Sequence, residues 1–206
     1  MRFAGKEFSF GGCVFRVCEN VYEPSDDSFL FAENLAVKRG DRVLDVGTGC
    51  GLLGVVAAKK ASFVVGVDVN RFAVRCALAN AKLNGVSDKM MFVAGDLFSA
   101  LSAVVRFDLV LFNAPYLPVE KGEGLPLLER AWSGGAGGRE VIDRFVVGVH
   151  ERLERGGKAL LLQSTLADVD ETLEKFGEQG LRAKIIAEKS LPFFESIVLV
   201  EAVRLL

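Results

Sequence analysis

Three aspartates end or follow three successive apolar runs, which makes them candidates for binding one polar ligand. Asp45 lies two residues before Gly47, where its carboxylate would meet a cationic or amine-bearing group. Asp68 ends the run VVGVD, where it would accept hydrogen bonds from two ribose hydroxyls. Asp96 follows VAG, where its carboxylate and the Leu97 backbone would meet the exocyclic amine of an adenine. Each aspartate alone is more typical of a helix N-cap or a solvated loop, but three acids in this arrangement favour a nucleoside ligand.

The stretch VLDVGTGCGLLG, residues 43–54, places several glycines directly after an apolar run. Glycines there let the backbone turn tightly and approach a ligand at the N-terminus of the next helix. Gly49, Gly51 and Gly54 also satisfy the GxGxxG pattern of dinucleotide-binding folds, so an enzyme that uses a nicotinamide or a flavin stays open. The glycines alone predict a ligand-binding loop without naming the ligand.

A third polar feature ends the apolar run FDLVLF at residues 107–112, where Asn113, Ala114, Pro115 and Tyr116 follow. An amide, a proline and an aromatic ring stand directly after a segment with the composition of a buried strand. Because Ala114 precedes a proline, its backbone is biased towards the extended region. The alternative without function is an ordinary turn that ends a strand and carries a surface tyrosine.

Short apolar runs alternate with helical patterns, which is typical of βαβ units and a largely parallel sheet. The expected strands cover residues 42–46, 63–67, 90–94, 107–112 and 158–163. Three of the expected helices, the second of them beginning at residue 139, should end at Gly85, Gly156 and Gly180. The runs RAKIIAEKS and SIVLVEAVRLL have only LPFFE between them, so an antiparallel hairpin should close the sheet. No linker or repeat is visible, so residues 1–206 should form one domain.

Two single residues have simple structural interpretations. Ser25 is a suitable N-cap for a helix over DDSFLFAENLA, whose acidic residues would lie in its first turn. His150, the one histidine, lies late in a predicted helix, where an interaction with the helix dipole is favoured over catalysis. No general base is therefore apparent.

The composition excludes several classes of protein. With 50% hydrophobic and 25% charged residues, a chain of 206 residues can form a globular protein with a sizeable core. A formal net charge of −2 provides no broad basic face, which disfavours nucleic acid as a direct partner. No apolar run approaches a membrane span and the N-terminus lacks a signal-peptide core, so we expect no membrane partner and a cytoplasmic location.

The cysteines do not form a metal-binding pattern. Cys13, Cys18, Cys50 and Cys76 include no CxxC pair, and a single histidine cannot complete the usual zinc spacings. We therefore expect no metal site and interpret all four as reduced thiols in the core.

With the acids and glycines in this order, nearly the whole chain resembles the class I S-adenosylmethionine-dependent methyltransferases. The resemblance implies an α/β, Rossmann-like fold with a seven-stranded, mostly parallel sheet, the last strand antiparallel, and helices on both faces. It implies S-adenosylmethionine as cofactor and S-adenosylhomocysteine as product, with Asp45 at the methionine amino group, the glycines at its carboxylate and sulfonium, Asp68 at the ribose and Asp96 at the adenine. The cofactor residues that it implies here are Asp45, Gly47, Thr48, Gly49, Gly51, Asp68, Val69, Asp96, Leu97 and Asn113.

The sequence NAPY resembles the (N/D)PPY motif of methyltransferases that act on planar amide or amine nitrogens. The resemblance implies that the Asn113 side-chain oxygen and the Ala114 carbonyl accept the two N–H bonds of the substrate. Tyr116 would pack on its planar group, and Pro115 would stiffen the turn. Because such a nitrogen is a poor nucleophile, orientation does most of the catalytic work. Ala114 replaces the first proline of the motif, which keeps the carbonyl but loses a fixed φ and puts rigidity and rate in question.

Two further segments, VYEPSDDSFLFAENL at 21–35 and WSGGAGGREVIDRF at 132–145, are similar to the short archaeal and eukaryotic branch of the HemK-like protein-glutamine methyltransferases. This resemblance implies that residues 1–37 form an N-terminal extension and helix that close the cofactor site. The glycines of SGGAGG would form part of the substrate-pocket wall, although a flexible loop is the simpler alternative. The implied cofactor contacts in the first segment are Tyr22, Pro24, Asp27 and Ser28.

The family resemblance also implies a substrate and a partner. The substrate would be the glutamine of the Gly-Gly-Gln loop in a class 1 translation release factor, methylated on its side-chain nitrogen. A small zinc-binding activator subunit would form a heterodimer with this chain. The chain's high mean hydropathy fits a partly covered surface, or equally a core rich in its 16 phenylalanines.

Two rival functions stay open. A nucleic-acid methyltransferase of adenine N6 or guanine N2, acting on tRNA, rRNA or DNA, would use the same Asn113 and Tyr116 but should show a basic docking surface. A redox enzyme or a nucleotide-binding module would rest on the GxGxxG pattern alone. The combined motifs favour protein-glutamine methylation over both.

Overall fold

The computed structural model describes residues 3–119, 128–192 and 195–205 of the chain. It divides into two compact units, Met1–Ser102 and Ala103–Leu206. That the chain forms one domain stays a prediction.

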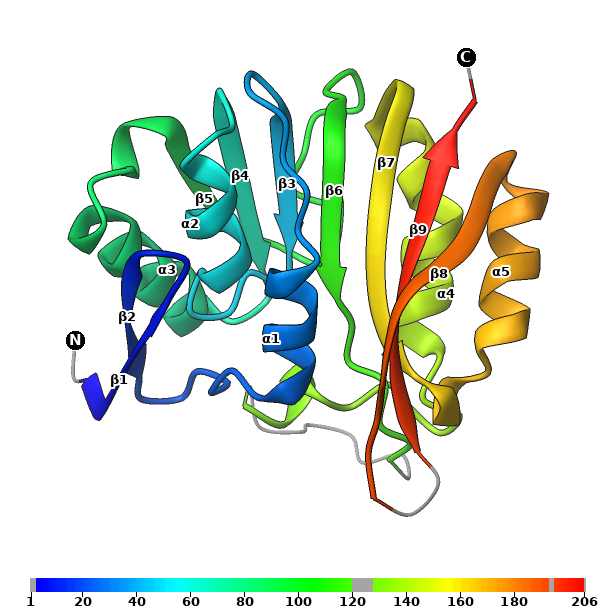
Figure 1. Ribbon diagram of the computed structural model, residues 1–206, viewed down its shortest axis with the longest axis horizontal. Coiled ribbons are helices and arrows are strands. Elements are labelled where there is room, and N and C mark those ends of the chain that lie inside the picture. Colours follow the sequence, from blue (N-terminus) through cyan, green and yellow to red (C-terminus); the bar gives the residue numbers. More distant parts are fainter. Residues whose placement is uncertain (1–2, 120–127, 193–194, 206) are drawn as a thin grey trace. The chain divides into compact units, whose positions relative to one another are not determined.

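The first unit alternates strands and helices after an N-terminal hairpin. Its three parallel strands lie in the order β5-β4-β3, and α2 and α3 pack against strands of this sheet (Figure 1). The predicted strands 42–46, 63–67 and 90–94 are confirmed, the second ending one residue later. The elements are β1 Phe3–Phe10, β2 Cys13–Cys18, α1 Asp26–Glu33, β3 Arg42–Val46, α2 Leu52–Ala58, β4 Phe63–Asp68, α3 Arg71–Leu83, the 3₁₀ turn η1 Ser87–Lys89 and β5 Met90–Ala94.

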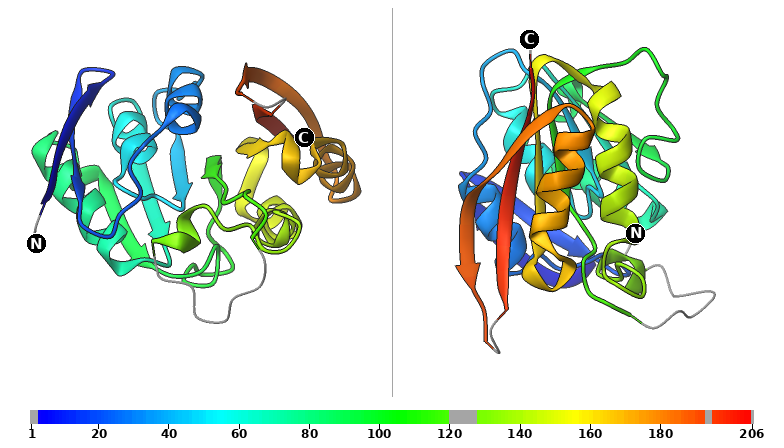
Figure 2. Two further views of the ribbon diagram at one scale, coloured as in Figure 1. Left: turned by 90° about the horizontal axis from the view of Figure 1, so that it is seen from below. Right: turned by 90° about the vertical axis from the view of Figure 1, so that its right-hand side faces the viewer.

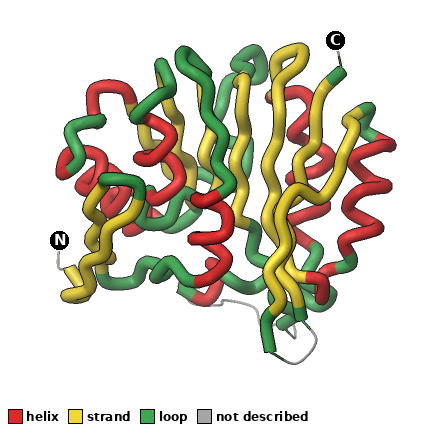
Figure 3. The backbone as a smooth tube through the Cα atoms, in the orientation of Figure 1, coloured by secondary structure: helices red, strands yellow, loops and turns green. Residues whose placement is uncertain are grey.

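The hairpin of β1 and β2 is not among the predicted elements (Figure 3). Its connection is Gly11-Gly12, and both glycines have positive φ, +56° and +75°. Two residues with φ > 0 form the type I′ turn that matches the twist of antiparallel strands. The stretch FSFGGCVF, in which two glycines separate apolar and aromatic runs, is the sequence signal that would have predicted this hairpin.

The helices of the first unit begin and end at residues of the expected types. Asn70 is the N-cap of α3, and its side chain accepts a hydrogen bond from the Phe72 N–H at 2.9 Å. Gly85, with φ +66°, follows the end of α3 as predicted. Ser25 precedes α1 as predicted, although α1 ends at Glu33 and so is shorter than expected.

The second unit contains a four-stranded sheet in the order β6-β7-β9-β8. Strands β6 and β7 are parallel, whereas β9 is antiparallel to both β7 and β8, so the predicted closing hairpin is confirmed. Helices α4 and α5 pack against each other, and α5 packs on β8 (Figure 2). The elements are β6 Phe107–Asn113, the 3₁₀ turn η2 Glu129–Ala131, α4 Glu140–Val149, η3 His150–Arg152, β7 Leu153–Ser164, η4 Thr165–Ala167, α5 Val169–Glu178, β8 Leu181–Ser190 and β9 Ser196–Arg204.

The predicted helix end at Gly156 is wrong. Helix α4 stops at Val149, His150 directly follows it, and β7 already begins at Leu153. Leu153 is fully buried opposite Phe107, and the register between β6 and β7 shifts after this pair. Gly156 therefore lies inside the irregular start of a strand, with φ +75°, because burial of Leu153 outweighs the helical pattern of the sequence. Gly180, with φ +74°, follows α5 as predicted.

The prediction of four reduced thiols is wrong for two of the cysteines. Cys18 at the end of β2 and Cys76 in α3 form a disulfide with Cα atoms 5.8 Å apart. Cys13 and Cys50 are buried free thiols, as expected, and burial raises the pKa of the Cys50 thiol to about 12. Pairing depends on the distance between Cα atoms in the fold, which residues 58 positions apart in the sequence do not reveal.

Two kinds of feature are absent from the described ranges, 3–119, 128–192 and 195–205. No helix in these ranges is both long and apolar enough to cross a bilayer. Nor do these ranges contain a cluster of three or more histidine, cysteine, aspartate or glutamate side chains suited to a metal ion. Of the LPFFE segment, Phe193 and Phe194 lie outside the described residues.

Candidate active site

The three aspartates lie at one edge of the sheet in the first unit. Asp68 is the last residue of β4 and pairs in register with Ala94, the last residue of β5. Asp45 is the penultimate residue of β3, opposite Gly66, and Asp96 follows β5 by two residues. Because parallel strands end at a common edge, the fold gathers acids that are 23 and 28 residues apart.

Asp45 lies beneath the glycine-rich loop, with 1% of its surface exposed. One of its carboxylate oxygens accepts hydrogen bonds from the Thr48 hydroxyl at 2.6 Å and from the Gly54 N–H at 3.0 Å. Burial raises the pKa of Asp45 from 3.8 to about 7, against the lowering effect of these two bonds; the charge of Asp68 adds a smaller increase. Asp45 thus ties the loop to the start of α2, and its contact with a methionine amino group stays a prediction.

The loop of residues 47–51 depends on glycine. Gly47, Gly49 and Gly51 have φ of +65°, +55° and +88°, in the left-handed region that other residues rarely adopt. A Cβ on Gly51 would lie 3.0 Å from both Cα and Cβ of Ala77 in α3. The loop is therefore in close contact with α3 and leaves a turn of bare backbone at the strand end.

Asp68 holds this loop from the second strand. Its two carboxylate oxygens accept hydrogen bonds from the Gly49 N–H at 2.9 Å and the Asn70 N–H at 2.8 Å. Burial raises the pKa of Asp68, while these two bonds oppose the rise. Each carboxylate oxygen has a second lone pair, so this side chain can still accept bonds from ribose hydroxyls.

The other residues predicted to bind the cofactor from this edge are Val69, Asp96 and Leu97. Val69 is 43% exposed, and Asp96 is exposed with its N–H bonded to the Ser99 hydroxyl at 3.1 Å. Leu97 has φ +48°, an unusual value for a leucine and one that is typical of functional loops.

In the N-terminal segment, the Tyr22 hydroxyl donates to Asp27, with both carboxylate oxygens 3.3 Å away. Asp27 is buried and accepts hydrogen bonds from the backbone and hydroxyl of Ser28 at 2.6 and 3.0 Å. The structure brings these three residues together, while Pro24 is partly exposed before α1. Their contact with a cofactor stays a prediction.

In the second unit, the NAPY segment begins at the last residue of β6. Asn113 pairs in register with Leu162 of β7, and the Ala114 N–H donates to the Leu162 carbonyl at 3.2 Å. A proline at position 114 would lack this donor. Alanine at this position therefore lacks the fixed φ of a proline, but its N–H forms a hydrogen bond that fixes the turn to the sheet. Ala114 and Pro115 are buried, and Asn113 and Tyr116 are partly exposed.

The glycine-rich segment SGGAGG pairs with the chain that follows Tyr116. The Leu117 N–H donates to the Trp132 carbonyl and the Gly134 N–H donates to the Leu117 carbonyl, both at 2.9 Å. A Cβ on Gly138 would lie 2.4 Å from the Tyr116 carbonyl oxygen. Only glycine allows this approach, so the segment is a backbone clamp on the NAPY turn. Its predicted place in a substrate-pocket wall is untested.

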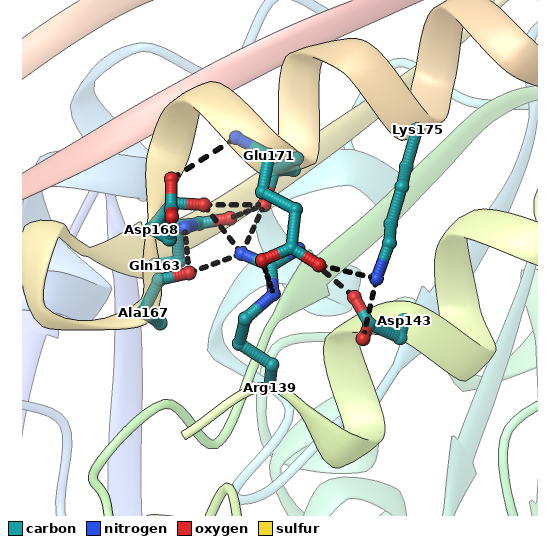
Figure 4. Close-up of polar contacts among 8 residues, drawn as sticks. Arg139, Asp143, Gln163, Ala167, Asp168, Glu171 and Lys175 are labelled. Atoms are coloured by element: carbon teal, nitrogen blue, oxygen red, sulfur yellow. Dashed lines mark hydrogen bonds and ion pairs between the residues drawn. The ribbon is translucent and has the colours of Figure 1, made fainter. Parts of the chain in front are cut away.

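A polar network fixes the end of this clamp (Figure 4). Arg139, next to Gly138, donates to the carbonyls of Ala167 and Asp168 and forms ion pairs with Asp143 and Glu171. Lys175 bridges the same two acids at 2.7 and 2.6 Å, and the bonds to Asp143 and then Glu171 raise the pKa of Lys175. The network joins the start of α4 to the start of α5.

Two groups of supporting residues were not predicted from the sequence. One is Arg139 with its carbonyl partners, for which the sequence gives no signal beyond an arginine after glycines. The other is Asn80 of α3 and Asn84, the C-cap of α3, which bond to β2. Two asparagines four residues apart within a mostly apolar helix face are a signal that could have been used.

Comparison with known proteins agrees with this arrangement. The family model of the methyltransferase small domain matches residues 23–125, half of the chain. A protein of Methanocaldococcus jannaschii, with the predicted activity of a protein N5-glutamine methyltransferase, is 40% identical over 190 residues, which cover 91% of this chain and 94% of that protein. The chain belongs to the HemK-like methyltransferases.

Another member of the HemK-like family is human methyltransferase HEMK2, 33% identical over 196 residues, which cover 87% of this chain and 89% of that protein. Among solved structures, the E. cuniculi Mtq2–Trm112 complex, described as responsible for methylation of the eRF1 translation termination factor, matches with a TM-score of 0.69 and 25% identity. The match covers 90% of this chain and 99% of that one.

The expected class I methyltransferase fold is confirmed by these comparisons. Within the described residues, three strands of the first unit and four of the second form the seven strands of that fold, with β9 antiparallel. This HemK-like protein is an S-adenosylmethionine-dependent methyltransferase, as the sequence predicted. The dinucleotide-dependent redox alternative is thereby excluded.

Proposed function

We propose that this protein methylates the side-chain nitrogen of the Gly-Gly-Gln glutamine in a class 1 translation release factor, and that a small zinc-binding activator subunit assists it. The observation that carries the proposal is the NAPY turn, in which a side-chain amide at the last residue of β6 and the main-chain carbonyl of the next residue are fixed by Leu162 and by the glycine clamp. The relatives named for protein-glutamine and termination-factor methylation support it.

The residues at the sheet edge of the first unit fit S-adenosylmethionine. The left-handed turns of Gly47, Gly49 and Gly51 provide bare backbone for the methionine end. Asp68 has lone pairs left for ribose hydroxyls. Leu97, next to Asp96, has an unusual backbone conformation with positive φ. This donor set suits an amine, a ribose and an adenine, which are the polar parts of the cofactor.

In the proposed mechanism, Asn113 and Ala114 orient the substrate. Their oxygens accept the two N–H bonds of the glutamine amide, which aims the nitrogen lone pair, while Tyr116 packs on the planar group. When bound, S-adenosylmethionine would supply the methyl group and leave as S-adenosylhomocysteine, and the acceptor would be the nitrogen lone pair that Asn113 and Ala114 orient. The extra proton on nitrogen passes to water, so the chain needs no general base for this reaction.

The test is a methyl-transfer assay with S-adenosylmethionine and the release factor of the same organism, with and without a candidate zinc-binding activator. Mass spectrometry of the Gly-Gly-Gln peptide reads the product. One added methyl on the glutamine is expected. Methylation of tRNA or rRNA in parallel reactions, with none on the release factor, would instead establish the nucleic-acid alternative.

Asn113→Ala separates chemistry from cofactor binding in the same assay. We expect transfer to fall by about 100-fold or more, because the amide loses its orientation. We expect the affinity for S-adenosylhomocysteine to fall by less than about tenfold, the order of one lost hydrogen bond. Equal activity of Asn113→Ala and the wild type would refute the role of this residue.

A further inference from the structure

Helix α3 acts as a pairing partner for strand β2. Alternate residues of β2, namely Val14, Arg16 and Cys18, meet in turn Asn84, the C-cap of α3, and the α3 residues Asn80 and Cys76. Residues spaced by two along a strand thus match residues spaced by four along a helix. The result is a three-rung attachment made of two amides and a disulfide.

The two asparagines bond to β2 in the same way. Asn80 accepts from the Arg16 N–H at 3.0 Å and donates to the Arg16 carbonyl at 2.9 Å. Asn84 accepts from the Val14 N–H at 2.9 Å and donates to the Val14 carbonyl at 2.7 Å. Each side chain therefore satisfies one N–H and one carbonyl of the strand, as a neighbouring strand would.

The remaining N–H of each amide distinguishes the two asparagines. Asn84, the C-cap of α3, donates it back to the helix, to the Asn80 carbonyl at 2.8 Å. Asn80 donates it to the Cys50 carbonyl at 2.8 Å, in the glycine-rich loop. Only 1% of the Asn80 surface is exposed, so without this donor the Cys50 carbonyl would have to find another partner in a buried place.

The contact with Cys50 adds to a second contact between the loop and α3. Gly51 presses against Ala77, one helical turn before Asn80. Gly51 also donates to the Thr48 carbonyl at 2.7 Å, which closes the turn of the loop. The loop is therefore positioned by α3 at two adjacent points, one steric and one polar.

We propose that Asn80 is a positioning residue of the cofactor site, which fixes the loop of residues 47–51 and links it to β2. This inference rests on the proposed binding of the cofactor by that loop. Asn84 makes the same bonds to β2 without touching the loop, so it supports the strand alone. Occupancy of the cofactor site and order in β2 are coupled through Asn80.

The test compares Asn80→Ala with Asn84→Ala, each measured for affinity for S-adenosylhomocysteine by calorimetry and for free energy of unfolding. Both substitutions should destabilise the protein. Only Asn80→Ala should also weaken the affinity, by about tenfold, the order expected for one hydrogen bond in a buried site. Asn84→Ala should stay within about twofold of the wild type, whereas equal affinities of the two variants would overturn the proposal.

A measurement on the wild type keeps the proposal testable if Asn80→Ala does not fold. Amide hydrogen exchange should slow at the Arg16 N–H on addition of S-adenosylhomocysteine, because its acceptor Asn80 also holds the loop. The Val14 N–H, bonded to Asn84, should change less, and the same change at both amides would overturn the proposal. If the wild type binds no S-adenosylhomocysteine, the proposed cofactor role itself fails and the coupling fails with it.

Discussion

Replacing Asp45 by asparagine should stabilise the ligand-free protein at neutral and alkaline pH. The carboxyl of Asp45 is buried, with a pKa of about 7 in the fold against 3.8 for its ordinary value. Between about pH 4 and pH 7 the folded state therefore holds a proton at Asp45 that the unfolded state has lost. Stability falls as pH rises wherever the folded state binds more protons, so Asp45 lowers stability across this window and has a constant effect above it.

The size of the effect follows from the pKa difference. About three pH units at 1.36 kcal/mol each correspond to about 4 kcal/mol of lost stability at pH 8 relative to pH 4. An asparagine stays neutral, and its oxygen can still accept from the Thr48 hydroxyl and the Gly54 N–H. Its NH₂ group lacks an assigned partner in this buried place, which costs about 2 kcal/mol at every pH. The variant should therefore be less stable than the wild type at pH 4 and more stable at pH 8, by about 2 kcal/mol in each case.

Urea denaturation of both proteins without ligand, at intervals from pH 4 to pH 8, measures this difference. Asp88→Asn, at an exposed position, controls for the removal of a negative charge. The free-energy difference between Asp45→Asn and the wild type should rise through the window and level off near pH 7. A difference that does not change with pH would refute the conclusion that burial holds the Asp45 carboxyl protonated.

Two other changes test the supports of the site. Gly138→Ala places a Cβ against the Tyr116 carbonyl at a residue with φ +73°, so the NAPY turn should shift. We expect methyl transfer to fall at least tenfold in steady-state assays, with the affinity for S-adenosylhomocysteine unchanged. Full activity of this variant would contradict the clamp. Reduction of the Cys18–Cys76 disulfide, which spans 58 residues, should lower the free energy of unfolding by about 4 kcal/mol, as measured by denaturant titrations with and without reductant. Cys18→Ser is the control, because its stability should not depend on reductant. Coincident titrations of the wild type with and without reductant would show that the bond does not form in solution.

Local composition was enough to predict much of the fold. Buried parallel strands are continuous apolar runs, so β3, β4, β5 and β6 were found within one residue of their ends. The hairpin of β8 and β9 followed from the absence of a helix between two runs. The start of β7 was wrong because residues 150–157 carry a helical pattern, and only the burial of Leu153 opposite Phe107 favours a strand there.

The candidate site likewise contains residues that the sequence predicted and contacts that it did not. Asp45, Asp68 and Asp96 were found because parallel strands end at a common edge, so position along the sequence predicts position in space. The NAPY residues were found because an amide and a ring after a buried strand match a known motif. The hydrogen bond of the Ala114 N–H and the close approach of Gly138 were not predictable, because they depend on a carbonyl of β7 and on the Tyr116 carbonyl.

The sequence by itself determined the fold class, the family and the cofactor, because these depend on short segments whose residue types and spacing can be recognised without the fold; the residues that would contact the cofactor stay a prediction. Only the tertiary structure decided how the segments are held. The pairing of Cys18 with Cys76, the bonds of Asn80 to Arg16 and Cys50, and the bonds of Arg139 to Ala167 and Asp168 each join residues that are 28 to 64 positions apart. Such contacts form only when packing has brought the elements together, and no local pattern identifies the partner residues.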